Sequence, residues 1–172
     1  KIQSLRIIIR TNSNIHISDQ NKKRIFNKEK IEYIKKSLSS LVNSIKHFEN
    51  KFNQIKINLT IIDQSKNDKL LEEFDKIFSN ISSKFEIINF DKNELKNEIN
   101  VDYKKDIFGN LSSLLKCFKI AKQSNEDLIF FLEDDYIHKK SLIEEMILTY
   151  ERISSQLNRE LILCPADYPY LY

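Results

Sequence analysis

The chain of 172 residues contains a single glycine, Gly109. A P-loop needs two glycines in the pattern GxxxxGK, and a dinucleotide-binding fingerprint needs three in GxGxxG. Neither pattern can occur here, which excludes the usual P-loop ATPases and Rossmann dehydrogenases. The run Phe130–Asp135 superficially resembles the acidic strand of an ATPase. The phosphate-binding loop that must accompany such a strand is missing.

Cysteine is also scarce, and it forms no metal-binding pattern. Cys117 and Cys164 lie in apolar segments and neither belongs to a CxxC motif. This pattern favours buried thiols over a disulfide or a zinc site, and it fits a reducing compartment. We therefore expect a cytoplasmic protein, either free or peripheral at the inner membrane.

No charge sign dominates the chain, and no long apolar run is present. There are 28 basic and 25 acidic residues, for a net charge of +3, and bases alternate with acids in segments such as Lys28–Glu32. A nucleic-acid-binding surface would need a basic patch with few acids, so we expect no nucleic-acid partner. The apolar runs are also far too short to cross a bilayer, so we expect no transmembrane segment.

Apolar residues follow two alternating patterns along the chain. Short runs predict five strands, and helical spacing predicts four helices between them. The expected strands cover residues 5–10, 55–62, 85–90, 128–132 and 161–164, and the expected helices cover 28–50, 70–81, 111–121 and 142–157. Asp91–Phe108 is predicted to be a long loop, with Asn110 as the N-cap of the third helix. Such alternation predicts an α/β fold with a mainly parallel sheet flanked by helices.

Polar side chains follow three of the expected strands at their carboxyl ends. Arg10 and Thr11 end the first strand, Asp63 ends the second, and the carboxylates of Glu133–Asp135 end the fourth. Ligands bind at this edge of a parallel sheet. Three like charges cannot pack together unless a cation or hydrogen-bond donors neutralise them, and oxygen ligands suit Mg²⁺ or Mn²⁺. The alternative is a solvated acidic turn.

Taken together, these residues resemble the nucleotide-sugar glycosyltransferases of the GT-A fold, and most closely glycosyltransferase family 2. The matching positions are Arg10 and Thr11 at the nucleotide pocket, Ser37–Leu41 in the first helix, Asp63 at the base, Gly109 and Asn110 before the acidic strand, and Glu133–Asp135 as the DxD-type motif. The sequence departs from the family at Gln64, where the family has glycine, and in contracting Asp-x-Asp to Glu-Asp-Asp. The resemblance implies a Rossmann-like GT-A nucleotide-diphospho-sugar transferase fold, as a single domain over residues 1–172.

The resemblance also implies an activity. The chain would move a sugar from a nucleoside-diphosphate sugar to an acceptor, with inversion, and the acceptor would be a glycan, a lipid-linked molecule or a protein. A Mn²⁺ or Mg²⁺ ion would bridge the phosphates and stabilise the departing diphosphate. By this resemblance Asp135 is the direct metal ligand, Asp134 assists the metal shell or the sugar, and Glu133 meets the ribose hydroxyls. Asp63 would accept a hydrogen bond from the base or ribose.

The acceptor side is the least complete part of this interpretation. Gly109 would let the backbone approach the sugar-nucleotide, although an ordinary loop glycine is an equal alternative. Asp167, in the tyrosine-rich segment Cys164–Tyr172, is the candidate general base that would deprotonate an acceptor hydroxyl. Its alternative is a turn aspartate, because the family's base usually lies further along the chain. We therefore expect these residues to contain the donor-binding half and only the edge of the acceptor side.

Two other functions stay open at this point. A nucleotidyltransferase can share the fold and a metal-bound carboxylate pair, but it typically carries a glycine-rich loop near its first strand. The segment Thr11–Asn14 has no glycine. A non-catalytic α/β binding module is the second alternative, and it would bind neither a metal ion nor a nucleoside diphosphate.

Overall fold

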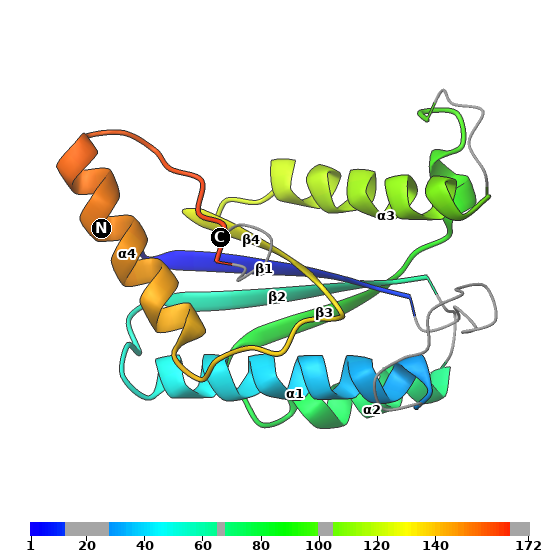
Figure 1. Ribbon diagram of the computed structural model, residues 1–172, viewed down its shortest axis with the longest axis horizontal. Coiled ribbons are helices and arrows are strands. Elements are labelled where there is room, and N and C mark those ends of the chain that lie inside the picture. The colour runs from blue at the N-terminus through cyan, green and yellow to red at the C-terminus, as the bar shows by residue number, and fades with distance from the viewer. Residues whose placement is uncertain (13–27, 65–67, 100–104, 166–172) are drawn as a thin grey trace.

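The computed structural model describes residues 1–12, 28–64, 68–99 and 105–165. Within these ranges the protein is an α/β domain, in which a four-stranded, all-parallel sheet is flanked by helices (Figure 1). The strands are β1 (Ser4–Thr11), β2 (Lys56–Asp63), β3 (Lys84–Asn89) and β4 (Leu128–Glu133), and the helices are α1 (Lys30–Glu49), α2 (Asp68–Phe78), α3 (Lys105–Lys122) and α4 (Leu142–Leu157), with a 3₁₀ turn, η2 (Lys92–Leu95). None of the helices described is both long enough and apolar enough to cross a membrane.

The strand order is β3-β2-β1-β4, so the chain builds the sheet in two directions from β1. It first moves outward through β2 to β3 and then returns to the other side of β1 to form β4. The order therefore reverses between β1 and β4. Ligands of open parallel sheets bind at such a reversal, outside the carboxyl ends of the strands. A ligand site is therefore expected at the carboxyl ends of β1 and β4.

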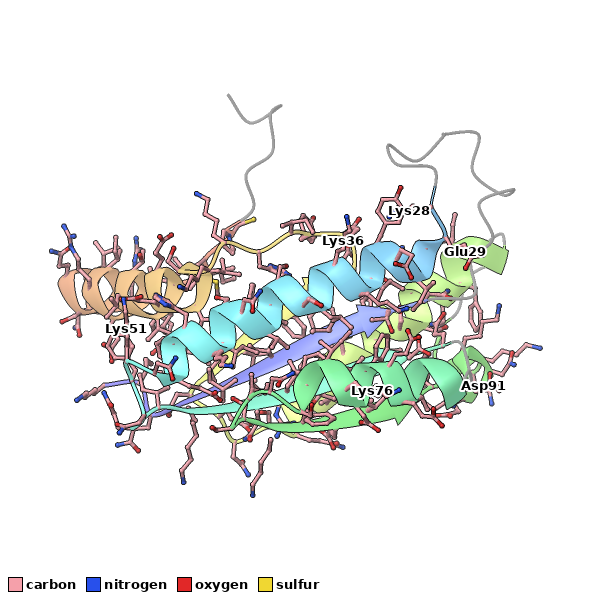
Figure 2. The ribbon with its side chains drawn as sticks, turned by 90° about the horizontal axis from the view of Figure 1, so that it is seen from below. Lys28, Glu29, Lys36, Lys51, Lys76 and Asp91 are labelled. Atoms are coloured by element: carbon pink, nitrogen blue, oxygen red, sulfur yellow. The ribbon has the colours of Figure 1, made fainter. Side chains whose placement is uncertain are left out.

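Both faces of the sheet are packed, as the apolar strands predicted. On one face, Leu5, Ile7 and Ile9 of β1 join a large core with α1, α2 and α4. On the other face, Ile8 joins a smaller core that includes Cys117 of α3. Figure 1 shows α1 and α2 on one side of the sheet and α3 on the other. Charged side chains such as Lys36 and Lys76 lie on the outer faces of α1 and α2 (Figure 2).

A polar network ties the strands together toward their amino ends. Arg6 of β1 forms two hydrogen bonds with Glu126, 2.8 and 3.1 Å long, and it also donates to Thr60 and Glu86. The Arg6 guanidinium, with further donors from Ser124 and Asn58, lowers the pKa of Glu126 to about 2. This charged network lies at the opposite end of β1 from the polar residues of the predicted site.

The predicted fifth strand is wrong. Residues 161–165 form neither a strand nor a helix, Ile162 is 98% exposed, and Cys164 is exposed instead of buried. A short apolar run becomes a strand only when it finds a partner and a face to pack on, and propensity alone does not supply them. Asn158, in the left-handed conformation with φ of 49°, ends α4 just before this run.

The boundaries before α3 also differ from the prediction. The expected long loop contains η2, which Asp91 and Glu94 close with a capping box. Helix α3 begins at Lys105, so Gly109 and Asn110 lie inside the helix, and Asn110 is not its N-cap. The pattern Asp-x-x-Glu was readable as a helix start. A glycine inside a helix is disfavoured by about 1 kcal/mol, which tertiary contacts can outweigh.

Candidate functional site at the carboxyl end of the sheet

The parallel register brings the predicted residues of three strands to one edge. Thr11 pairs with Asp63 between β1 and β2, and Arg10 pairs with Glu133 between β1 and β4. Asp134 directly follows β4. The convergence that the strand ends predicted is therefore present, and it lies at the β1–β4 reversal of strand order.

Asp63 faces the interior of the protein. Its side chain accepts a 2.7 Å hydrogen bond from Thr11 Oγ1, and the two residues are 0% and 3% exposed. The Asp63 backbone oxygen accepts a 2.8 Å hydrogen bond from Phe90 N. In this conformation the buried carboxylate joins the ends of β1 and β2, and its contact with a base or ribose stays a prediction.

Arg10 connects three elements at the edge. Its guanidinium forms an ion pair with Glu133 at the end of β4 and donates to the side-chain and backbone oxygens of Asn110 on α3. The Arg10 side chain is 19% exposed and that of Glu133 is 45% exposed. Arg10 and Glu133 therefore meet, as the strand ends predicted, and Asn110 of α3 joins them, but the three residues bind each other.

Asp134 is held by a lysine that the sequence analysis missed. Its Oδ2 atom lies 3.3 Å from Lys30 Nζ and accepts a 3.2 Å hydrogen bond from Asn12 N. Burial raises the pKa of Asp134, and the Lys30 ammonium opposes this shift. The signal for Lys30 was its position, because a cation in the first turn of a helix opposes the helix dipole unless an anion compensates it.

Asp135 differs from both of its acidic neighbours. It is exposed, and it makes no hydrogen bond or ion pair among the residues that the structure describes. The same residues contain no group of three or more histidine, cysteine or acidic side chains that could hold a metal ion. A metal here would have one open carboxylate, and its other ligands would be phosphate oxygens and water. Mg²⁺ is often bound in this way, through one or two carboxylates and substrate phosphates, so this donor set fits it.

Gln64, which stands where the family has glycine, joins the sheet edge to α3. Its Nε2 atom donates a 2.9 Å hydrogen bond to the Gly109 backbone oxygen, and its Oε1 atom accepts from Asn12 Nδ2 at 3.3 Å. A Cβ atom on Gly109 would lie 3.6 Å from Gln64 Oε1, an ordinary van der Waals distance. The protein's own packing therefore does not require glycine at this position.

Two serines of α1 hold the connection between the acidic motif and α4. Ser40 Oγ accepts a 2.9 Å hydrogen bond from His138 N, and Ser44 Oγ accepts a 3.2 Å bond from Ile143 N. Burial lowers the pKa of the His138 imidazole. The serine-containing helix that entered the family resemblance thus has a structural role in this chain, because it anchors the segment that follows the carboxylates.

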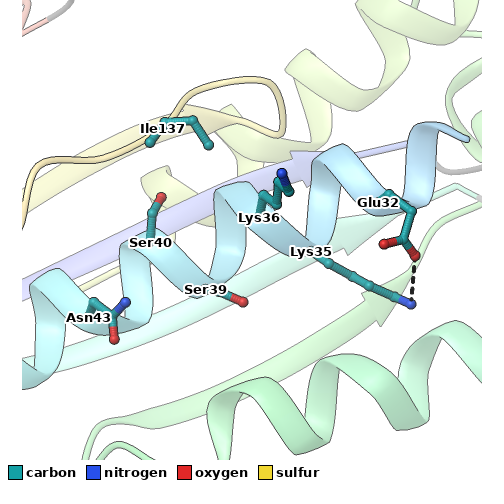
Figure 3. Close-up of a pocket in the computed structure, with 7 residues that line it drawn as sticks. All are labelled: Glu32, Lys35, Lys36, Ser39, Ser40, Asn43 and Ile137. Atoms are coloured by element: carbon teal, nitrogen blue, oxygen red, sulfur yellow. Dashed lines mark hydrogen bonds and ion pairs between the residues drawn. The ribbon is translucent and has the colours of Figure 1, made fainter. Parts of the chain in front are cut away.

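A shallow pocket of about 400 Å³ lies beside this connection (Figure 3). It is lined by Glu32, Lys35, Lys36, Ser39, Ser40, Asn43 and Ile137. None of the predicted site residues takes part in it, and Lys35 is already paired with Glu32 and Glu73. The pocket is therefore distinct from the polar edge of the sheet.

Asp167, the candidate base, lies outside the described residues.

Comparison with models of protein families gives no match, and no curated protein matches the chain. The resemblance to family 2 glycosyltransferases therefore stays a prediction from the residues quoted for it.

Proposed function

We propose that the chain binds a nucleoside-diphosphate sugar together with Mn²⁺ or Mg²⁺ and acts as a glycosyltransferase. The observation that carries the proposal is the set of charges at the β1–β4 reversal of strand order. Arg10 and Lys30 supply positive charge there, and Asp135 supplies an open carboxylate. A diphosphate bound through a divalent ion needs both kinds of group.

Each residue has a role in this proposal. Asp135 holds the metal ion, which supplies charge stabilisation to the departing diphosphate when it is bound. Arg10 and Lys30 provide hydrogen-bond donors for phosphate oxygens. Glu133, whose side chain is 45% exposed, is the acceptor for ribose hydroxyls. Asp63 acts indirectly, because its bond to Thr11 fixes the strand end under the site.

The acceptor half of the reaction rests on the resemblance alone. Inversion would need a base that removes the proton from an acceptor hydroxyl while that oxygen attacks the sugar. Asp167 remains the candidate, and the acceptor remains a glycan, a lipid-linked molecule or a protein.

A non-catalytic α/β binding module is the second candidate, and one observation favours it. Glu133 and Asp134 are already neutralised by Arg10 and Lys30. An acidic edge of this kind can be stable without any ligand. A nucleotidyltransferase has no comparable support from the described geometry.

Binding measurements on the variant Asp135→Asn test the proposal. We expect wild-type protein to bind a uridine or guanosine diphosphate in the presence of Mn²⁺. We expect the variant to bind about tenfold more weakly or worse, since a contact to a charged group is worth roughly 1.5–3 kcal/mol. The substitution keeps side-chain volume, so the fold is retained. Isothermal titration calorimetry with and without Mn²⁺ measures this difference.

Asp75→Asn is the matched control, because Asp75 is an exposed aspartate on α2. It should bind like the wild type. Equal affinity in wild-type protein and Asp135→Asn would contradict the metal assignment. If wild-type protein binds neither the nucleoside diphosphates nor their sugars, the non-catalytic module becomes the better account.

A further inference from the structure

The strand-end carboxylates carry their own counter-ions. Arg10 is paired with Glu133, and Lys30 with Asp134. The side chains of these two cations are only 19% and 17% exposed. Among the residues that the structure describes, two cations therefore face three carboxylates, and the charge on Asp135 is left for an external partner.

These ion pairs oppose the binding of a metal ion alone or of a diphosphate alone. A divalent ion that approaches Glu133 or Asp134 meets a cation already in place, and like charges repel at short range. A diphosphate that approaches Arg10 or Lys30 meets the carboxylate that holds it. Breaking the Lys30–Asp134 pair from one side would leave a nearly buried charge without compensation, which is strongly unfavourable.

The two ligands together remove this obstacle. Lys30 can turn from Asp134 to a phosphate oxygen while the freed carboxylate turns to the metal ion, so no charge loses its partner. Arg10 and Glu133 can make the same exchange. Both cations have suitable side chains, since lysine carries three rotatable donors on a flexible stem and arginine offers a planar fork that matches phosphate.

We propose that Arg10 and Lys30 are exchangeable counter-ions, which pair with Glu133 and Asp134 in the free protein and with the diphosphate in the complex. This inference rests on the proposed function and adds that the two ligands bind cooperatively. The metal ion and the diphosphate each bind weakly alone and strengthen each other. By thermodynamic linkage, each raises the affinity of the other by the same factor.

A variant that lacks one counter-ion distinguishes an exchangeable ion pair from a purely structural one. Lys30→Met keeps the apolar stem of the side chain but removes its charge. Asp134 is then free for a metal ion, whereas a phosphate has lost a partner. Affinity for Mn²⁺ alone should rise and affinity for pyrophosphate alone should fall, each by about tenfold or more, the equivalent of one charged hydrogen bond. Arg10→Gln should shift both affinities in the same directions through Glu133.

The experiment is calorimetric titration with Mn²⁺ alone, with pyrophosphate alone, and with each in the presence of the other. Lys35→Met is the matched control, because Lys35 lies on the same helix and is paired with Glu73, 2.6 Å away. It should leave every affinity unchanged. Thermal unfolding checks that each variant is folded. If Lys30→Met is not folded, Arg10→Gln carries the test, since its partner Glu133 is half exposed and tolerates the loss better.

Three results would overturn the exchange. One is Mn²⁺ affinity that is unchanged or weaker in the folded counter-ion variants. Another is wild-type protein in which Mn²⁺ and pyrophosphate bind independently. The last is wild-type protein that binds neither Mn²⁺ nor pyrophosphate, alone or together, and this result would also contradict the proposed function. Pyrophosphate has no nucleoside, so the two proposals can fail separately. If Mn²⁺ and pyrophosphate bind cooperatively but nucleoside diphosphates do not bind, the proposed function is contradicted and the exchange is retained. Uncoupled binding together with nucleoside diphosphate affinity would do the reverse.

Discussion

Asp134 and Asp135 are neighbours in sequence with opposite environments. Asp134 is 9% exposed and is bound by Lys30 and by the Asn12 N–H, whereas Asp135 is exposed. In the free protein, Asp134 therefore holds the strand end in place, whereas Asp135 is available to a ligand. The apolar run followed by three acids predicted the cluster but not this division of roles, because the division depends on a lysine from another element.

Substituting these two residues should affect stability unequally. Asp134→Asn leaves the shielded Lys30 ammonium without its charged partner, so the free energy of unfolding should fall by about 1–3 kcal/mol. Asp135→Asn removes a charge from solvent and should change it by no more than about 0.5 kcal/mol. Urea denaturation of both variants gives the comparison. Equal losses would show that Lys30 does not stabilise Asp134 as the geometry indicates.

At the scale of elements, apolar runs were easier to locate than the strand pairing that decides whether a run joins the sheet. Apolar runs located β1 to β4, but a similar run at 161–164 is not a strand, since the described residues provide no strand that pairs with it. Gly109 was read as a helix boundary, and α3 instead passes through it. Local sequence marks where a helix can begin, whereas tertiary contacts can override this preference.

Gly109→Ala separates two explanations for that glycine. Alanine favours a helix interior over glycine by about 1 kcal/mol, and the added Cβ would meet no close protein atom. The variant should therefore be more stable, by roughly 0.5–1 kcal/mol in thermal unfolding. If Gly109 permits close approach of a ligand, the same variant loses affinity for nucleoside diphosphate. A destabilised variant would contradict the packing described around Gln64.

At the scale of the whole molecule, the sequence predicted the edge at which the polar residues meet. Alternating strands and helices implied a parallel sheet, and its carboxyl edge collects Arg10, Thr11, Asp63 and the acidic motif whatever the strand order. The order β3-β2-β1-β4, which puts β4 beside β1, was not readable from one sequence. Neither was the burial of the Asp63 side chain, because burial is a property of the assembled sheet.

The central claim is that a nucleoside diphosphate binds at the end of β1 and β4. Its most direct test uses the only glycine of the chain. Protein labelled with ¹⁵N at glycine has one backbone amide signal, from Gly109, whose carbonyl is bonded to Gln64 at this edge. We predict that a uridine or guanosine diphosphate with Mg²⁺ shifts this signal in a saturable way, and that Mg²⁺ alone does not. A signal that stays in place while calorimetry shows the nucleotide binding would put the ligand elsewhere and contradict the account.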